Sequence, residues 1–257
     1  DPVTGLLSPA ATVAVGVQPE TIACDPSGRF AFVANASSST ISVMKINLNT
    51  GALSPVVAPA PASGTPRSVA VHPSGRYLYT AFEGDWAKLY RSDSTEPLLQ
   101  EPGLNMGASI QGDKMAVVLT RDGNAEIYLA TLEGELLARL TFNETIDVSP
   151  TWAPGGGRIA FVSDRDGTPQ VYVMGADGSG QSRVTFRGSY NQTPSWCGRC
   201  DTQTLTFAGR DGGTFDVFTV EVGTGTMRRL TQFQGSNADP TWSPDGRLIG
   251  FYSSRGG

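Results

Sequence analysis

The strongest constraint on the fold is a repeat of about 40–45 residues that recurs along the chain. Its clearest copy, Ser149 to Gly178, contains three runs predicted to be β-strands: one ending at Trp152, one from Arg158 to Val162 and one from Gln170 to Met174. Asp166-Gly167 lies between the last two runs and predicts a tight hairpin of type I′, in which both central residues have positive φ. Three strands cannot bury both of their faces alone, so this unit must pack against further copies.

The other copies are recognised by the turn that precedes their second strand. This turn falls at intervals of 47, 38, 43, 44 and 46 residues, at Pro26, Pro73, Gln111, Pro154, Gly198 and Pro244. Six β-rich units of this period predict an all-β fold, a six-bladed β-propeller that forms a single domain over residues 1–257. The 31 glycines and 17 prolines suit many short strands joined by turns.

The two ends of the chain are expected to complete the last blade together. Gly5 to Val15 has the pattern of an outer strand, and Asp239 to Ser254 has the pattern of the first two strands of a blade. No counterpart of the third strand follows Arg255, so the last blade lacks one strand in this pattern. Either the closing blade has three strands with a gap or shift, or another molecule fills the place, since an unpaired edge favours association. We predict a monomeric closed ring with an incomplete last blade.

Charge and hydropathy exclude several classes of partner. The formal net charge of −5 argues against nucleic acid, which needs a clustered basic face. No run approaches the roughly 18 apolar residues of a membrane helix, so membrane insertion is not expected. The chain opens without a charged-then-apolar signal peptide, which predicts a mature form, a fragment or an engineered product.

The first third of the chain has its own style of repeat. Residues 25–29 and 72–76 share the pattern Asp/His-Pro-Ser-Gly-Arg, and a Thr-Gly-x-Leu-Ser-Pro segment precedes each of them, at Thr4–Pro9 and Thr50–Pro55. These residues resemble the YVTN and lactonase-type propeller repeats of bacteria and archaea. The resemblance implies a lactonase-like hydrolase as one alternative function. That activity would need histidines and carboxylates around the channel, and the sequence contains a single histidine, His72.

From about Ala87 onward the style changes. Ser163–Gly167, Val171–Gly178 and the Arg-Leu-Thr segments at 139–141 and 229–231 resemble TolB, the periplasmic propeller of the Tol–Pal system. This resemblance covers residues 87–257 and implies a six-bladed propeller without catalytic activity, located in the periplasm, that binds the lipoprotein Pal at one face. The N-terminal α/β domain with which that family engages TolA has no counterpart in these 257 residues.

The two styles meet at an apparent junction, residues 84–88, between lactonase-like blades (1–83) and TolB-like blades (89–257). We interpret the chain as a hybrid of two propeller families, formed by recombination or by engineering. Propellers tolerate such fusion because each blade contacts mainly its neighbours. The favoured function is therefore a non-enzymatic scaffold with a protein-binding face at the channel mouth, and the alternative is a TolB-like module that binds Pal.

Cys197 and Cys200 form a CxxC motif where other repeats have a Pro-Asp-Gly turn. A structural zinc site needs four ligands, and the chain offers only Cys24 and His72 besides these two. A redox motif would need a βαβ context, which is missing. The motif therefore predicts a turn closed by a local disulfide, or two free thiols, and Cys24 is expected to be a small buried hydrophobe.

Residues that recur in every repeat are expected to serve the fold. Trp152, Trp196 and Trp242 should pack between blades, each with one partner for its indole N–H. The Arg-Asp pairs that begin at Arg121, Arg165 and Arg210 should form turns and salt bridges. His72 is expected to be a polar turn residue, because no Gly-x-Ser-x-Gly elbow accompanies it.

Function should lie in the loops that lead from each outer strand to the next inner strand, at the mouth of the central channel. The candidate partner-binding residues are Glu144, Asp147, Tyr190, Asn191, Asn237 and Asp239. Asp147, Asn191 and Asn237 are in phase and are expected to point toward the channel mouth, and Tyr190 is a candidate anchor. Oxygens that converge from several blades make a channel cation an open alternative, although no loop resembles an EF-hand and no cofactor is otherwise expected.

Overall fold

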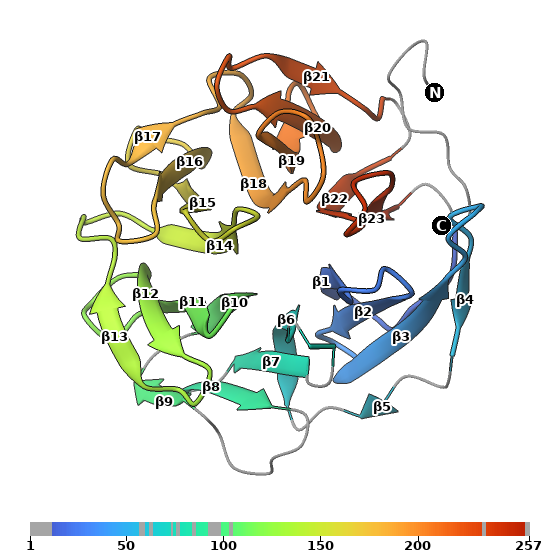
Figure 1. The fold of residues 1–257 in the computed structure, drawn as a ribbon, viewed down its shortest axis with the longest axis horizontal. Coiled ribbons are helices and arrows are strands. Elements are labelled where there is room, and N and C mark those ends of the chain that lie inside the picture. The colour runs from blue at the N-terminus through green and yellow to red at the C-terminus, as the bar shows by residue number, and fades with distance from the viewer. Residues whose placement is uncertain are drawn as a thin grey trace.

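The computed structural model describes residues 12–56, 60–61, 64–72, 74–75, 78–83, 86–91, 99–102, 105–232 and 235–254. Over these residues the chain is all-β, with 23 strands and no helix, and so no helix in this part of the chain could span a membrane. The strands form six separate antiparallel sheets set around a central channel, as in a propeller (Figure 1).

The sheets follow one another in sequence order. The first contains β1 (Pro19–Cys24), β2 (Phe30–Asn35), β3 (Thr40–Ile46) and β4 (Leu53–Pro55), and β5 (Ala60–Pro61) also pairs with β3. The second contains β6 (Thr65–Val71), β7 (Leu78–Glu83), β8 (Trp86–Arg91) and β9 (Leu99–Pro102). The third contains β10 (Asn105–Gln111), β11 (Lys114–Leu119), β12 (Glu126–Thr131) and β13 (Leu136–Arg139).

The remaining three sheets are built in the same way. The fourth contains β14 (Asp147–Trp152), β15 (Arg158–Ser163), β16 (Gln170–Gly175) and β17 (Ser182–Arg183). The fifth contains β18 (Tyr190–Trp196), β19 (Thr204–Arg210), β20 (Phe215–Glu221) and β21 (Met227–Arg229). The last contains β22 (Asn237–Trp242) and β23 (Ile249–Ser253), its two strands among the described residues.

The first strand of each sheet lies beside the channel. These inner strands are β1, β6, β10, β14, β18 and β22, and each contacts the inner strand of the next sheet. Because β22 also contacts β1, the ring of inner strands is closed. Chain connections from one sheet to the next therefore return from the rim to the channel.

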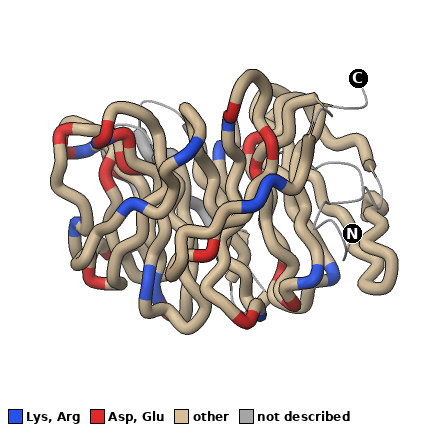
Figure 2. The backbone as a smooth tube through the Cα atoms, turned by 90° about the horizontal axis from the view of Figure 1, so that it is seen from above, with Lys and Arg blue, Asp and Glu red and all other residues tan. Residues whose placement is uncertain are grey.

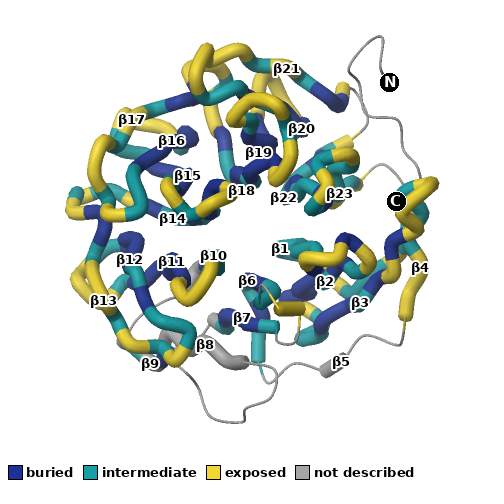
Figure 3. Tube along the Cα trace, viewed as in Figure 1, coloured by how far each residue is buried: buried dark blue, intermediate teal, exposed yellow. Residues whose placement is uncertain are grey.

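The core lies between neighbouring sheets and not within any one of them. Middle strands are buried on both faces: all residues of β11 from Met115 to Leu119 are buried, for example (Figure 3). Phe161 and Tyr172 of the fourth sheet pack against Ile127 of the third. This two-sided burial explains why middle strands are continuous apolar runs, whereas a strand with one face in water would alternate.

The sequence predicted most strand positions correctly, but the type I′ hairpin was wrong. Six residues separate β15 from β16, and Gly167 has a φ of 91° while Asp166 keeps a negative φ. The turn is closed by Gly167 N–H, which donates to the carbonyl of Asp164 at 2.8 Å. The longer loop lets the Asp166 carboxylate accept a hydrogen bond from the Tyr172 hydroxyl at 2.5 Å.

The predicted pairing of the chain ends is not seen among the described residues. Residues 12–15 form no strand, and Val13 and Val15 pack against the core of the first sheet instead of beside β23. The rest of that predicted strand, Arg255 and the start of the apparent junction (Gly84 and Asp85) lie outside the described residues. Lys88 lies within β8.

Candidate partner-binding face and central channel

The loops that lead into the inner strands define one face of the disc, which we call the loop face. Among the predicted partner-binding residues, Glu144 is exposed on this face, and Tyr190 is exposed at the start of β18. The Tyr190 ring meets the Phe215 ring edge-on, with centroids 5.6 Å apart. Asp239 lines the channel. The other three, Asp147, Asn191 and Asn237, are buried.

The two buried asparagines connect neighbouring sheets. Asn191 donates from Nδ2 to Gln170 Oε1 of the fourth sheet at 2.7 Å. Asn237 occupies the equivalent position one sheet later and donates from Nδ2 to Asp216 Oδ1 at 3.2 Å. The expectation that these side chains point toward the channel mouth is therefore wrong, because the neighbouring sheet supplies a buried oxygen that the amide must satisfy.

The equivalent position between the third and fourth sheets holds two carboxylates, Glu126 and Asp147, both fully buried. Asn143 connects them: its backbone N–H donates to Glu126 Oε1 at 3.1 Å, and its Nδ2 donates to Asp147 Oδ2 at 2.6 Å. Arg139 pairs with Glu126 at 3.1 Å, and Arg165 pairs with Asp147 at 2.9 Å. Glu126 Oε2 and Asp147 Oδ1 are buried without a hydrogen-bond partner in the described chain. Asp147 is thus a buried structural residue in which one oxygen is unsatisfied.

Asp147→Asn is expected to raise the free energy of unfolding by about 1 kcal/mol. The new amide would set a donor against Glu126, whose Oε2 also lacks a partner, as Asn191 and Asn237 do against Gln170 and Asp216 in the next two sheets, and its oxygen would still accept from Asn143 and Arg165. Urea unfolding followed by circular dichroism measures the change. The matched reverse change, Asn237→Asp, sets a second carboxylate against Asp216 and should lower the stability. A loss of stability in Asp147→Asn would contradict this reading of the site.

The repeated Arg-Asp turns are structural, as the sequence predicted. Asp166 accepts from the Tyr172 hydroxyl and from Arg183 Nη1 at 3.3 Å, so the loop is tied to the outer strand. The bond from Tyr172 and the nearby Arg183 lower the pKa of Asp166, whereas burial and this same bond raise the pKa of Tyr172 to about 12. Asp122 and Tyr128 repeat the arrangement one sheet earlier.

The in-phase tryptophans pack between sheets, also as predicted. Trp152 donates its indole N–H to the carbonyl of Ser109, and Trp196 donates to the carbonyl of Thr151, each at 3.1 Å on the preceding inner strand. Trp242 departs from this pattern, because its indole N–H is buried without a partner in the described chain. Its backbone N–H instead donates to Ser195 Oγ at 3.4 Å.

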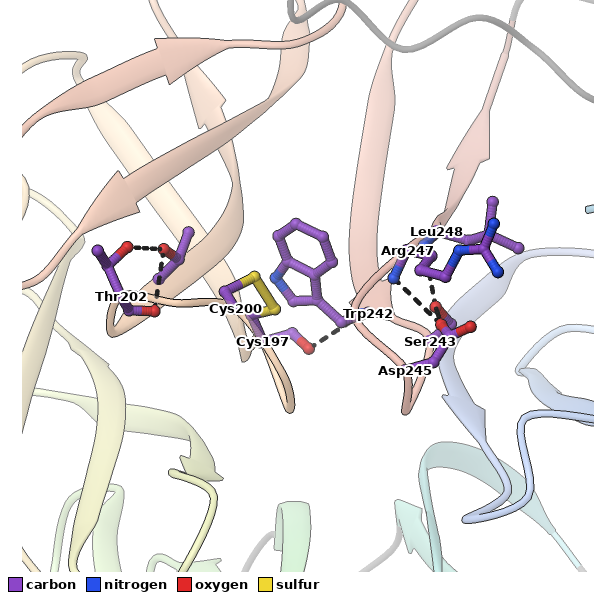
Figure 4. Close-up of a disulfide and its surroundings, with 10 residues drawn as sticks. Cys197, Cys200, Thr202, Trp242, Ser243, Asp245, Arg247 and Leu248 are labelled. Carbon is purple, nitrogen blue, oxygen red and sulfur yellow. Dashed lines mark hydrogen bonds between the residues drawn. A yellow bond between two sulfur atoms is a disulfide. The ribbon is translucent and has the colours of Figure 1, made fainter. Parts of the chain in front are cut away.

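Cys197 and Cys200 form a disulfide across the turn between β18 and β19 (Figure 4). The turn packs against the matching turn of the last sheet: a Cβ added to Gly246 would lie 2.9 Å from Cys197 Sγ, and one added to Gly198 would lie 3.0 Å from the carbonyl oxygen of Pro244. In the last sheet, side-chain hydrogen bonds close the turn, since Leu248 N–H donates to Ser243 Oγ at 2.9 Å. The disulfide performs the same task covalently.

His72 has the structural surroundings that the sequence predicted, whereas Cys24, predicted to be buried, is only partly buried and lines the central channel. His72 Nδ1 accepts from the backbone N–H of Ser74 at 3.0 Å and closes its own turn. Asp25 does the same one sheet earlier, where it accepts from the N–H groups of Ser27 and Phe30. Cys24 packs with the core of the first sheet, and burial raises the pKa of its thiol to about 12, so the unreactive protonated form predominates.

The central channel contains a cavity of about 280 Å³ lined by residues of all six inner strands. Ser149, Thr193 and Asp239 line it from three successive sheets, at β-bulges where φ is 53°, 50° and 50°. Each of the three precedes a proline. Left-handed backbone at residues other than glycine costs free energy and is concentrated at functional sites. The repeated strain marks this ring of residues as a candidate site.

Asp239 is the one carboxylate among the residues that line the channel cavity. Burial, and then the nearby Glu20 carboxylate, raise its pKa to about 7, while the Thr193 hydroxyl beside it opposes the rise. Glu20 itself pairs with Arg67 at 2.7 Å. The described residues contain no cluster of three or more His, Cys, Asp or Glu side chains that could hold a metal ion. Glu20 thus has a basic partner, whereas Asp239 has none among the described residues.

Besides the predicted Tyr190, the loop face carries exposed apolar side chains that were not predicted from the sequence. Phe142 and Phe186 are 73% and 70% exposed, and Ile146 and Tyr190 are 49% and 38% exposed. The two pairs are in phase, 44 residues apart in neighbouring loops. Arg139 stacks on the Phe142 ring at 5.0 Å, and Arg183 stacks on the Phe186 ring at 5.1 Å. The repeated Thr-Phe at 141–142 and 185–186 was the sequence pattern that could have revealed them.

Charged residues, unlike the exposed apolar residues, are not concentrated on the loop face. Acidic and basic residues are mixed on both faces of the disc (Figure 2). The loop face is therefore distinguished by its exposed apolar side chains and by the channel carboxylate, not by a dominant sign of charge.

Comparison with known proteins also indicates a β-propeller. A family model described as the TolB beta propeller domain matches residues 27–202, and so crosses the apparent junction at 84–88. A Tol-Pal system protein TolB of Francisella tularensis is 38% identical over 56 residues, which is 22% of this chain and 13% of that protein. An uncharacterized protein of Agrobacterium fabrum is 40% identical over 57 residues, 22% of this chain and 20% of that protein. The YVTN and lactonase-type resemblance and the hybrid origin remain predictions.

Solved structures share the fold. TolB from Acinetobacter baumannii superposes with a TM-score of 0.69 at 24% identity, over 91% of this chain and 63% of that one. A putative TolB from Agrobacterium tumefaciens gives 0.69 at 18% identity, over 91% and 90% of the two chains. At such identities these likenesses show the fold alone. Since the family model covers more than half of the sequence, the chain belongs to the TolB β-propeller domain family.

Proposed function

We propose that this chain is a non-enzymatic TolB-like propeller module that binds a Pal-like lipoprotein through its loop face, in the periplasm and as a monomer. One observation carries the proposal. Of the nine large apolar side chains that are exposed in the described chain, five lie in or next to loops that lead into inner strands: Val17, Phe142, Ile146, Phe186 and Tyr190. Grouped exposed apolar residues are typical of protein-binding surfaces.

The form of these side chains suits a protein partner. Phe142 and Phe186 stack on arginines that are themselves paired with carboxylates, so their rings are held in place before any partner arrives. Tyr190 is supported by the Phe215 ring. Rigid aromatic side chains lose little conformational entropy on binding and are frequent binding anchors. Glu144 and Arg187, which are exposed between them, would supply the polar rim.

We propose, as part of this function, that the protein is located in the periplasm and forms a closed ring of six blades. The Cys197–Cys200 disulfide suits an oxidising compartment such as the periplasm. The proposed propeller has six blades, of which the two-stranded last sheet is the sixth. A completed blade would cover the free edge of β23 and favour a monomer.

A hydrolase is the less favoured alternative. The histidine that it would need, His72, has its Nδ1 engaged by Ser74 in a turn at the end of β6. This arrangement is the same in kind as that of Asp25, so it serves the fold. The likeness to Kuenenia stuttgartiensis hydrazine synthase, with a TM-score of 0.65 at 15% identity, concerns the fold alone.

Calorimetric titration with the soluble domain of a Pal lipoprotein tests the proposal. We expect micromolar binding, and we expect the double variant Phe186→Ala/Tyr190→Ala to weaken it about tenfold or more, because both rings are exposed on the loop face. The matched control is Leu137→Ala, which removes an exposed apolar side chain from outer strand β13. No heat from the folded wild-type protein, or equal losses in the double variant and the control, would refute the proposal.

A further inference from the structure

Five residues of the channel share one position in the repeat, five residues before the turn that defines the period. They are Thr21, Ser68, Ser149, Thr193 and Asp239, counted from Pro26, Pro73, Pro154, Gly198 and Pro244. All five line the central cavity of about 280 Å³. The position therefore sets four hydroxyl groups and one carboxylate around the cavity, from five different sheets.

The charge of this ring is not balanced within the described chain. The nearby acid, Glu20, has a counter-ion in Arg67 and accepts a further hydrogen bond from Gln18 Nε2 at 2.8 Å. Asp239 has no such counter-ion: no described lysine or arginine pairs with it, Glu20 is the charged group that acts on it most, and the Thr193 hydroxyl alone opposes the rise in its pKa. A carboxylate in a partly buried cavity without a cation is costly, and a ligand that supplies one removes that cost.

The chemistry of the ring discriminates between cations. Ca²⁺ takes six to eight oxygen ligands, usually including several carboxylates, whereas this cavity has a single carboxylate among its lining residues. An alkylammonium group carries three N–H donors and one charge. One carboxylate with hydroxyl oxygens around it matches that set, and the apolar walls from Val69, Ala108 and Ile22 suit an alkyl chain.

From this juxtaposition we propose that the channel is a binding site for a primary ammonium group, with Asp239 as its counter-ion and hydroxyls of the ring as hydrogen-bond acceptors. The group would come either from a lysine side chain of the protein partner or from a free linear amine. The first source rests on the proposed partner-binding function, but the site itself does not require a partner.

The test uses small probes with the intact chain and no partner, so its failure is separate from a failure of Pal binding. N-acetyl-lysine methylamide is titrated at pH 8 while the backbone amide signals of Thr193 and Asp239 are followed by NMR. We expect millimolar binding that Asp239→Asn weakens about tenfold or more, since the variant removes the counter-ion. Asp113→Asn removes the same charge from an exposed turn and should bind as the wild type does.

Two further arms sharpen the result. The trimethylated lysine probe has the same charge but no N–H donors, so it should bind more weakly; equal binding would overturn the proposed recognition of an ammonium group. Lowering the pH to 5.5 should weaken binding of the lysine probe, because Asp239 is then mostly protonated. Tighter binding of putrescine than of the lysine probe would assign the site to free amines, and the reverse would assign it to a partner's lysine. Binding of calcium chloride that depends on Asp239, without binding of either amine, would overturn the proposal.

Discussion

Replacing Asp216 by alanine is expected to lower the free energy of unfolding by about 3–5 kcal/mol, the largest effect of a single polar substitution in this chain. Asp216 is 1% exposed and joins three segments. Its carboxylate accepts from Arg229 Nε at 3.1 Å, from Thr231 Oγ1 at 2.7 Å and from Asn237 Nδ2 at 3.2 Å. Arg229 ends the outer strand of the same sheet, Thr231 follows that strand, and Asn237 belongs to the last sheet. Removing the carboxylate deprives the Asn237 amide and the Arg229 guanidinium of the acceptor that they share.

Urea unfolding followed by circular dichroism measures this effect. Asp211→Ala is the matched control, since Asp211 lies on the adjacent loop, is exposed, and contacts Arg187 at 3.8 Å. It should change stability by about 0.5 kcal/mol or less. Asp216→Asn keeps an acceptor for Thr231 and should fall between the two. An Asp216→Ala protein that unfolds at the same urea concentration as the control would show that the connection between the fifth and last sheets does not depend on this carboxylate.

The fold could be predicted from the sequence because the repeat is recognised from the intervals between its turns alone. Lys114–Leu119 was predicted as a strand and is β11, and the in-phase Trp152 and Trp196 pack between sheets as expected. A tryptophan that recurs at every repeat has one role that every repeat shares, so its environment follows from the period alone. The absence of other metal ligands left a local disulfide or two free thiols as the predictions for Cys197 and Cys200, and the structure has the disulfide.

The candidate site could be predicted only in part, because the first two residues of β18 face in opposite directions, and the sequence placed them in a loop. Asn191 follows Tyr190 in the sequence, yet it is buried against Gln170 while Tyr190 is exposed. Asp147 and Asn237 likewise begin strands that the sequence had placed in loops, so the alternation of a strand was not applied to them. The bulge at Asp239, which turns its side chain to the channel, was likewise invisible, since aspartate before proline occurs in many turns.

Asp239 in the channel gives the second large expected effect on stability, and the size of that effect depends on pH. The folded protein holds the pKa of Asp239 at about 7, above the ordinary value of 3.8, so folding favours the protonated form. Wild-type stability should therefore fall, through this group, as the pH rises from about 4 to about 7, and the full penalty applies above that range. The rise in pKa of about 3 units corresponds to about 4 kcal/mol, which solvent in the open channel reduces to about 2 kcal/mol.

Asp239→Asn removes the ionisation while it keeps the shape of the side chain. At pH 8 the variant should be more stable than the wild type by about 2 kcal/mol, or about 5 °C in melting temperature, and at pH 4 the two should melt together. Differential scanning calorimetry at both pH values measures the difference. Asp245→Asn is the control, because its pKa is lowered by the bond from Ser243 and its own pH dependence runs in the opposite direction. Equal melting temperatures of wild type and Asp239→Asn at pH 8 would mean that the ring of the channel already compensates this charge, and the argument for a cationic ligand would fall with it.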